Sequence, residues 1–166
     1  MQKTHTSTIL IDSKSLKIKD VTDVAKNNFR IALSQDSTEN IKAGRKLVEN
    51  IIESNKIVYS INTGFGALCR KIISKENIKQ MQKNFLMSHA VGVDDPFSEE
   101  VTRGIMLLRI NTLASGNCGV RLELVQTLVD MLNLGVHPYI PQKGSVGASG
   151  DLAPLAHLSA ILLGIG

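Results

Sequence analysis

The sequence predicts a mainly α-helical fold with minor short strands, and three observations support this. The 166 residues are 43% apolar but only 4% aromatic and contain no Trp, so a core would be packed with Leu, Ile, Val and Ala. Apolar residues recur at helical spacing through most of the chain. Most of the glycines, which weaken helices, lie in segments between those runs. A chain of this length predicts one domain, residues 1–166.

The N-terminal third contains one predicted strand and one predicted helix. Residues 8–11, TILI, can form a short strand. Asp36 and Glu39 have the spacing of a capping box, which predicts the start of a helix. A short apolar piece, IVYSI at residues 57–61, then leads into the glycine-rich turn NTGFGA. The apolar face of the helix would consist of Ile41, Gly44, Val48, Ile51 and Ile52.

Two helices are predicted in the middle of the chain. Ser74 is a typical N-cap for the first, which would end near Gly92. Asp95 and Pro96 are the residue types of a cap and a first-turn proline, so they predict the start of the second. The inward stripe of the first helix would be Ile78, Met81, Phe85 and His89. The second would be apolar on two sides and buried between several neighbours, with Val101, Ile105 and Leu108 on one side and Met106, Ile110 and Leu113 on the other.

The last part of the chain alternates helix, loop and helix. A helix over residues 121–134 would be closed by Gly135 in the left-handed conformation. Residues 137–151, HPYIPQKGSVGASGD, predict a structured but non-helical segment, because two prolines break helices and three glycines allow unusual backbone angles. A final helix would start near Asp151, with Pro154 tolerated in its first turn, and it is still apolar at the last residue.

Bulk properties exclude several classes of protein. The net charge of +4 comes mostly from single, scattered lysines, whereas nucleic-acid binders gather theirs into a stripe. Cys69 and Cys118 form no CxxC, and no His lies at metal spacing, so we expect reduced thiols in a cytoplasmic protein and no metal site. The N-terminus lacks the apolar core of a signal peptide, and residues 152–166 are too short to span a bilayer.

The segment GSVGASGDLAPLAH has two plain interpretations. It can be a tight turn before a helix, with glycines at the bend and Ser149 or Asp151 as the cap. It can also bind an anion, because exposed N–H groups at the start of a helix attract phosphate. Neither the GxxxxGK[ST] pattern nor the GxGxxG pattern is present, so the sequence does not favour a nucleotide site.

A third interpretation concerns the chemistry of Ala148, Ser149 and Gly150. A backbone nitrogen can attack the carbonyl two residues earlier only when bulky side chains do not block the approach, and the flanking alanine and glycine leave it open. If Gly150 nitrogen closed on the Ala148 carbonyl with loss of two waters, one of them carrying the Ser149 hydroxyl, an exocyclic methylene would remain. Such a group is an electrophile that no ordinary side chain supplies. The positive end of the following helix would favour the negative charge that develops there.

The wider pattern resembles the aromatic amino-acid ammonia-lyase family, in which an Ala-Ser-Gly triplet cyclises autocatalytically to a methylidene-imidazolone (MIO) group. The resemblance implies the helical N-terminal domain of the ammonia-lyase (aspartase/fumarase-like) fold, with no metal and no diffusible cofactor. It covers nearly all of residues 50–166. The segments that carry it are GSVGASGDLAPLAHLSA at residues 144–160, YSINTGFGALCR at 59–70, NFLMSHAVGVD at 84–94 and RGIMLLRINTLASGNCGVR at 103–121.

The resemblance assigns roles residue by residue. Ala148, Ser149 and Gly150 match the cyclising triplet, and Asp151 matches the acidic residue that supports cyclisation. Tyr59 matches the catalytic base, a role that requires surroundings that stabilise phenolate, since a phenol ordinarily has a pKa near 10. Gly66 matches a glycine whose backbone lies against the substrate. On the residues alone, Tyr59 is also interpretable as a half-buried strand tyrosine and Gly66 as a turn glycine.

The family match also indicates the substrate. Ser88 and His89 form the pattern of the histidine and tyrosine lyases, and His89 would help to bind the substrate, although a lone inward His is also typical of a core. The lack of threonine in GSVGASGDLAPLAH favours histidine. The implied reaction eliminates ammonia from L-histidine to give trans-urocanate in histidine breakdown. Asp94 departs from the pattern, because histidine lyases have glycine or another small residue there.

The family's chains are several times longer, so this sequence would be an N-terminal portion truncated before the central helical bundle. The parent would be a homotetramer whose active sites combine residues from three subunits, and the isolated chain would be inactive. A tyrosine ammonia-lyase or aminomutase on the same scaffold is one alternative. A non-catalytic helical interaction module, with residues 145–151 as a simple turn, is an alternative of another class.

Overall fold

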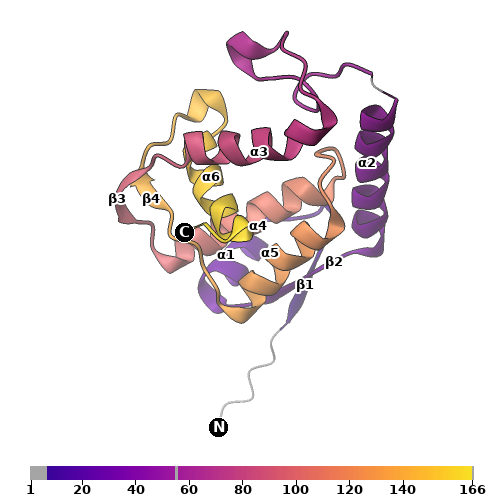
Figure 1. Ribbon diagram of the computed structural model, residues 1–166. Helices are drawn as coiled ribbons and strands as arrows, with labels where there is room; N and C mark the ends of the chain where they lie inside the picture. The colour runs from indigo at the N-terminus through magenta and orange to yellow at the C-terminus, as the bar shows by residue number, and fades with distance from the viewer. Residues whose placement is uncertain (1–6, 55, 166) are drawn as a thin grey trace. The chain divides into compact units, whose positions relative to one another are not determined.

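The computed structural model describes residues 7–54 and 56–165 and confirms a mainly helical fold with short strands (Figure 1). The predicted lack of a signal peptide rests largely on residues 1–6, which lie outside the described residues. In chain order the elements are β1 (Thr8–Ile11), α1 (Ile18–Asn27), β2 (Arg30–Leu33), α2 (Gln35–Glu53), α3 (Lys75–His89), β3 (Val93–Pro96), α4 (Glu99–Ala114), α5 (Leu122–Leu134), β4 (Pro141–Lys143) and α6 (Leu152–Ala160), with 3₁₀ turns at Gly66–Leu68, Gly147–Ser149 and Ile161–Leu163.

The chain divides into two compact units. The first unit comprises Met1–Arg45 and Phe97–Pro138, and the second comprises Lys46–Pro96 and Tyr139–Gly166. Among the described residues, no helix is both long and apolar enough to cross a membrane. All residues with a predicted role in chemistry belong to the second unit, which is therefore the unit that positions the site.

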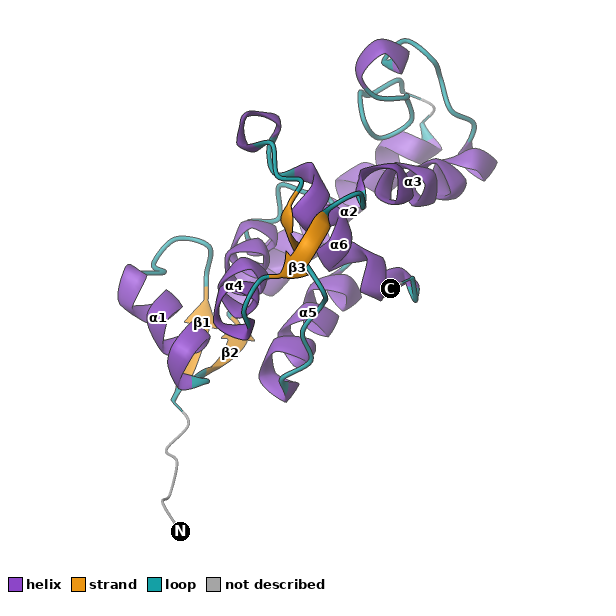
Figure 2. Ribbon diagram, turned by 90° about the vertical axis from the view of Figure 1, so that its left-hand side faces the viewer, coloured by secondary structure: helices purple, strands orange, loops and turns teal. Residues whose placement is uncertain are grey.

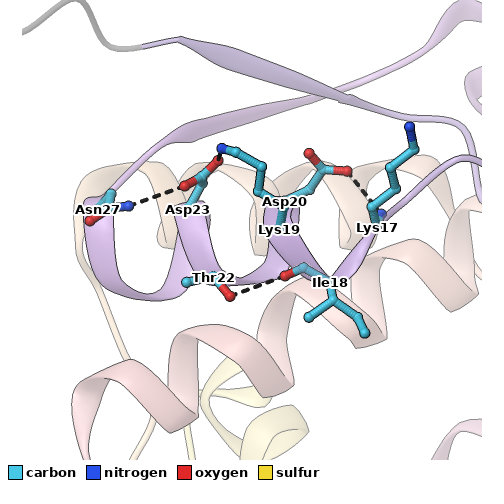
Figure 3. A network of polar contacts seen from close by, with 7 residues as sticks. All are labelled: Lys17, Ile18, Lys19, Asp20, Thr22, Asp23 and Asn27. Atoms are coloured by element: carbon cyan, nitrogen blue, oxygen red, sulfur yellow. Dashed lines mark hydrogen bonds and ion pairs between the residues drawn. The ribbon is translucent and has the colours of Figure 1, made fainter.

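In the first unit, β1 and β2 pair in parallel, with Thr8 opposite Arg30 and Ile11 opposite Leu33, so the predicted strand at residues 8–11 is confirmed (Figure 2). Helix α1 connects the two strands and packs on α4. Figure 3 shows how polar side chains hold α1: Asp20 accepts a hydrogen bond from the Lys17 backbone N–H at 2.8 Å, which satisfies a donor at the start of the helix. One turn later, Asp23 pairs with Lys19 and accepts a hydrogen bond from Asn27 at 3.1 Å.

A buried arginine joins the helices of the first unit. Arg103 of α4 is only 4% exposed, yet within the part of the chain that the structure describes its guanidinium hydrogen-bonds to no carboxylate. Its Nε donates to the Val24 carbonyl in α1 at 2.9 Å, and a terminal nitrogen donates to the Leu132 carbonyl in α5 at 3.0 Å. Both carbonyls lie in the last turn or so of their helices, where the helix dipole is negative and favours a cation.

Two predicted helix starts are wrong, for the same reason. Helix α2 begins at Gln35, and it is Ser34 whose hydroxyl accepts the Ser37 N–H at 3.1 Å, so Asp36 lies inside the first turn. Residues 95 and 96 belong to β3, and α4 begins at Glu99 after Ser98, which accepts the Val101 N–H at 3.4 Å. In both cases a serine near the predicted cap takes its role.

The other predicted helix boundaries are close to those observed. Ser74 is the N-cap residue of α3, and Gly135 closes α5 with a φ of 72°. The stripe of α3 is the less exposed side of that helix, as predicted. Only one of the two apolar sides of α4 is buried in this chain, because Val101 and Leu108 are exposed. Helix α6 ends at Ala160 and is followed by a 3₁₀ turn, so it does not continue to the last residue as predicted.

The second unit packs α3 against α6 and pairs β3 with β4. The pairing is antiparallel and irregular, with Val93 opposite Lys143 and Pro96 opposite Pro141. Its buried apolar residues are far fewer than those of the first unit. The buried apolar residues of the second unit are Ile78, Ile140, Ala153, Ala156 and Leu158. Those of the first unit are Ile11, Val24, Ile31, Ile41, Met106, Leu107, Ile110, Leu113, Ala114, Val125, Leu128, Val129 and Leu132.

Candidate active site

The Ala148-Ser149-Gly150 triplet lies in an exposed loop between β4 and α6. Residues 142–152 are all exposed. As predicted, residues 137–151 form no α-helix; within them Gly147–Ser149 form one 3₁₀ turn, in which the Ser149 N–H donates to the Val146 carbonyl at 2.8 Å and the Gly150 N–H donates to the Gly147 carbonyl at 3.1 Å. The Ser149 hydroxyl also donates to the Val146 carbonyl, at 2.7 Å. A single turn therefore holds both the nitrogen and the hydroxyl that ring closure requires.

The turn ends in two consecutive left-handed residues. Gly150 has a φ of 91° and Asp151 a φ of 55°, a conformation that disfavours most side chains and is tolerated best by Gly, Asn and Asp. Asp151 occupies the N-cap position of α6 but makes no cap hydrogen bond; its carboxylate accepts the Ser145 hydroxyl instead. The interpretation of Ser149 or Asp151 as a side-chain cap is therefore wrong.

The residues of the loop fit a backbone-derived ring. Alanine and glycine flank Ser149, and a Cβ added at Gly150 would meet nothing within 4 Å, so the space beside the Gly150 Cα is open. In the open peptide that nitrogen donates to Gly147 rather than facing the Ala148 carbonyl as a nucleophile. Closure thus requires the hydrogen bond from the Gly150 N–H to the Gly147 carbonyl to break.

Tyr59 lies in a turn held by its polar neighbours, and not on a strand. Asn62, which is buried, accepts the Val58 N–H at 2.8 Å and donates to the Lys56 carbonyl at 2.9 Å. Thr63 is also buried and accepts the Ser60 N–H at 3.2 Å. With the backbone on both sides fixed in this way, the Tyr59 side chain remains 58% exposed. The half-buried strand alternative for Tyr59 is therefore wrong.

A row of rings connects Tyr59 with His89. The Tyr59 and Phe65 rings meet edge to face at 6.3 Å between centroids, Phe65 and Phe85 lie 4.2 Å apart, and so do Phe85 and His89. The Nδ1 of His89 lies 2.8 Å from the Phe85 carbonyl and 3.0 Å from the Ser88 hydroxyl. A carbonyl can only accept, so Nδ1 carries the hydrogen and Nε2 of the neutral ring is an acceptor. The structure thus brings the predicted base and the predicted binding residue into one cluster.

Gly66 begins the short 3₁₀ turn that follows Phe65. Its φ is 53°, and a Cβ at this position would meet nothing within 4 Å, so its backbone is open to solvent. Gly64, two residues earlier, is different: a Cβ there would lie 2.6 Å from the Leu68 carbonyl oxygen. Gly64 therefore folds the loop, whereas Gly66 leaves accessible backbone beside the row of rings.

His157 lies on α6, six residues after Asp151, and the sequence alone assigns it no role. Its Nε2 accepts the Gly92 N–H at 3.0 Å. Burial lowers the pKa of this imidazole below its usual value of 6.5, so it is neutral at physiological pH. Gly92 follows His89 by three residues, which connects α6 to the end of α3. The sequence does show a histidine within an apolar helix, which could have singled out His157. It does not show the partner, because Gly92 is 65 residues away in sequence.

Asp94 stands where histidine lyases have glycine or another small residue, and its backbone conformation explains that preference. Asp94 has a φ of 81°, a left-handed conformation for which glycine is the usual residue. Its carboxylate pairs with Lys143 on β4 and accepts the Asp95 N–H at 3.0 Å. The Lys143 ammonium, followed by the Asp95 N–H, lowers the pKa of the Asp94 carboxyl below its usual range. These contacts help to offset the strain that an aspartate accepts at this position.

Comparison with known proteins assigns the chain. The family model described as aromatic amino acid lyase matches residues 16–166. This chain belongs to that family. The aromatic amino acid lyase chain is 50% identical over 158 residues to a histidine ammonia-lyase of Natranaerobius thermophilus, and 46% identical over 161 residues to one of Streptococcus pyogenes. These matches cover 95% and 97% of this chain but only 31% of each relative, so the chain spans about a third of their length.

Solved structures of family members superpose well on the lyase chain. A histidine ammonia-lyase from Trypanosoma cruzi matches with a TM-score of 0.86 at 34% identity, over 96% of this chain and 30% of that one. A tyrosine aminomutase from Streptomyces globisporus matches with a TM-score of 0.90 at 33% identity, again over 96% and 30%. The predicted ammonia-lyase fold is thereby confirmed.

Proposed function

We propose that the whole protein eliminates ammonia from L-histidine to give trans-urocanate, in histidine catabolism. The observation that carries this proposal is the 50% identity to a histidine ammonia-lyase over almost the entire chain. The row of rings that ends at Ser88 and His89 supports it, because a ring nitrogen and a hydroxyl beside aromatic faces suit an imidazole substrate.

Ala148, Ser149 and Gly150 would form the methylidene-imidazolone. The Gly150 nitrogen bonds to the Ala148 carbonyl carbon, and two waters leave, one with the carbonyl oxygen and one with the Ser149 hydroxyl. Once formed, the group supplies an electron-poor carbon that withdraws electrons from the substrate. Asp151 would support the closure, since its carboxylate is held by Ser145 beside the turn and can take a proton from it. No metal and no diffusible cofactor enters this proposal.

Three further residues would act on the substrate. Tyr59 would remove a proton, and this role is supported by its exposure of 58% and by its edge-to-face contact with Phe65. His89 would place the substrate through its ring. The open backbone at Gly66 would lie against the substrate. The remaining pocket residues would come from later parts of the chain and from other subunits of a homotetramer.

The 166-residue chain by itself is proposed to be inactive, because its site residues lie in an exposed loop and an exposed turn. Turnover of histidine by the purified chain would contradict this. We also propose that the protein acts in the cytoplasm, which is supported by Cys69 and Cys118, two free and exposed cysteines.

The deciding experiment measures the mass of the tryptic peptide containing residues 148–150 in the full-length enzyme, together with urocanate formation. We expect a deficit of two waters and activity in the wild type, and neither in Ser149→Ala. Ser54→Ala, at the exposed end of α2, is the matched control and should behave like the wild type. An unmodified peptide in an active enzyme, or full activity in Ser149→Ala, would reject the proposal and favour a non-catalytic interaction module.

A tyrosine ammonia-lyase or aminomutase is the second candidate, favoured by the TM-score of 0.90 to a tyrosine aminomutase. The two candidates share the triplet and differ in the substrate. Comparing kcat/KM for L-histidine and L-tyrosine with the full-length enzyme separates them. We expect histidine to be preferred, and a preference for tyrosine would replace the first candidate with the second.

A further inference from the structure

Two backbone segments cross at van der Waals distance within the second unit. A Cβ added at Gly144, four residues before Ala148, would lie 2.9 Å from the Gly92 Cα. A Cβ added at Gly92 would lie 3.1 Å from both the Pro141 Cβ and the His157 Nε2, and 3.2 Å from the Lys143 carbonyl oxygen. The segment that follows His89 therefore passes directly over the segment that precedes the triplet, with no room for a side chain between them.

One side chain bonds this crossing to α6. His157 accepts the Gly92 N–H through Nε2 at 3.0 Å, and α6 begins immediately after the triplet. An imidazole nitrogen can accept only while it is unprotonated, so the ring must be neutral with its hydrogen on Nδ1. A protonated ring would present an N–H to the Gly92 N–H, and two donors cannot bond.

We propose that His157 is a positioning residue whose neutral ring holds the segment after His89 against the segment before the triplet, and whose protonation releases it. The inference rests on the proposed function, in which His89 places the substrate and the triplet carries the electrophile. The inference adds to that function a residue, His157, that sets the position of His89 relative to the triplet. It also gives a reason for that position to depend on pH.

The charged groups around the crossing allow the His157 ring to change its protonation state with pH. From β3 and β4, Asp94 and Lys143 face the region, and they pair with each other, so their charges largely cancel. On α3, His89 is the titratable residue closest in sequence to Gly92, and its Nδ1 is held by the Phe85 carbonyl. Burial, the cause that lowers the pKa of His157, opposes protonation until the pH falls below the usual histidine range.

The test follows backbone amide hydrogen exchange in the full-length enzyme, for peptides that span residues 90–96, between pH 5 and pH 8. After correction for intrinsic rates, we expect wild-type protection to fall roughly fivefold as the pH falls, the loss expected for one hydrogen bond. His157→Gln keeps an acceptor oxygen that cannot be protonated, so its protection should be independent of pH. His157→Ala should be poorly protected throughout. His137→Gln, at a partly buried histidine of the first unit, is the matched control and should follow the wild type.

Kinetics provide the second readout. The acidic limb of kcat/KM should be shallower in His157→Gln than in the wild type, and comparing the two cancels the titration of the substrate itself. His157→Ala should raise KM more than it lowers kcat, with the mass deficit at residues 148–150 unchanged. Protection of residues 90–96 that is equal in wild type and His157→Gln at every pH would overturn the inference. A failure of the proposed function would appear differently, as an unmodified triplet in the wild type.

Discussion

At the scale of single residues, Arg103 shows how a charge is buried without an opposite charge at hydrogen-bonding distance among its described partners. Its donors go to the Val24 and Leu132 carbonyls and to the Nε2 of His137, at 3.2 Å. Burial lowers the pKa of the guanidinium below its usual value, but arginine stays charged at neutral pH. The carbonyl dipoles at two helix ends therefore supply the compensation that a carboxylate usually gives.

Arg103→Met should destabilise the chain strongly, because it removes the charged donor from the Val24 and Leu132 carbonyls, and a hydrogen bond to a charged group contributes roughly 1.5–3 kcal/mol. Arg103→Lys should recover only part of this, since one ammonium lacks the planar fork that reaches both carbonyls. Urea denaturation measures the free energy of unfolding. Arg30→Met, at an exposed position of β2, is the control and should change stability little. Equal stabilities for the two methionine variants would contradict the helix-joining role of Arg103.

His137 makes the stability of the first unit depend on pH. Burial is the main cause that lowers its pKa below 6.5, Arg103 lowers it further, and Glu99 partly opposes them. As the pH falls below about 6.5, the unfolded chain takes up a proton before the folded chain does. The free energy of unfolding should therefore be full above pH 6.5 and decline below it, until the folded protein is protonated as well. His137→Gln should flatten this decline in urea melts at successive pH values; an unchanged slope would refute it.

The residues of the candidate site and those that hold the elements together differ in how well the sequence predicts them. The triplet, Tyr59 and His89 lie inside contiguous motifs, so local pattern is enough to single them out. Arg103 and His157 act through partners 79 and 65 positions away in sequence, respectively. Their hydrogen bonds exist only after the elements pack. No spacing rule predicts such contacts, because the distance along the chain between donor and acceptor is set by topology.

At the scale of elements, helix α2 is positioned by a glycine within it. A Cβ added at Gly44 would lie 1.9 Å from the Gly116 carbonyl oxygen in the loop between α4 and α5, both in the first unit. Gly116 itself has a φ of 79° and lies against the Asn40 backbone. The backbone of α2 is thus in contact with the backbone of the loop between α4 and α5. Neither segment can move aside as a flexible side chain would.

Gly44→Ala and Gly104→Ala form a matched pair with opposite expected signs. Alanine in a helix gains about 1 kcal/mol over glycine from propensity alone. At Gly104 in α4 nothing lies within 4 Å of the added Cβ, so the free energy of unfolding should rise by roughly that amount. At Gly44 the clash with Gly116 should outweigh the gain and destabilise by roughly 1–3 kcal/mol. Thermal and urea unfolding measure both, and stabilisation by Gly44→Ala would contradict the close approach.

The elements also show why helix existence is easier to predict than helix ends. The inward stripe of α3 extends over about three turns, from Ile78 to His89, and identifies the helix by itself. The starts of α2 and α4 depend on which of several neighbouring polar residues captures a free N–H. Ser34 and Ser98 do so, although Asp36 and Asp95 had suitable chemistry. The choice depends on backbone direction, which β2 and β3 impose and which local sequence does not encode.

At the scale of the whole molecule, the two units differ in how much apolar surface they bury. The first unit contains most of the fully buried Leu, Ile, Val and Met side chains, whereas the second contains few large ones. Each buried side chain of this kind contributes roughly 1.5–3 kcal/mol before entropy is counted. The site residues therefore belong to the unit with the weaker core.

Hydrogen exchange of the 166-residue chain should show this difference directly. Amides of α4 and α5 should exchange slowly, near the rate of global unfolding, while amides of α3 and α6 should exchange much faster through local opening. The comparison needs no variant, because each chain contains both classes of amide. Equal protection of α3 and α4 would mean that the buried apolar residues do not determine local stability here.

The small core of the second unit has a calorimetric consequence. The heat capacity and enthalpy of unfolding both scale with the surface that unfolding exposes, so a unit that buries few apolar side chains absorbs little heat when it melts. A scanning calorimetry peak recorded for this chain would thus arise mainly from the first unit. A ligand or variant could reorganise the loop at residues 145–151 completely and leave the measured Tm where it was.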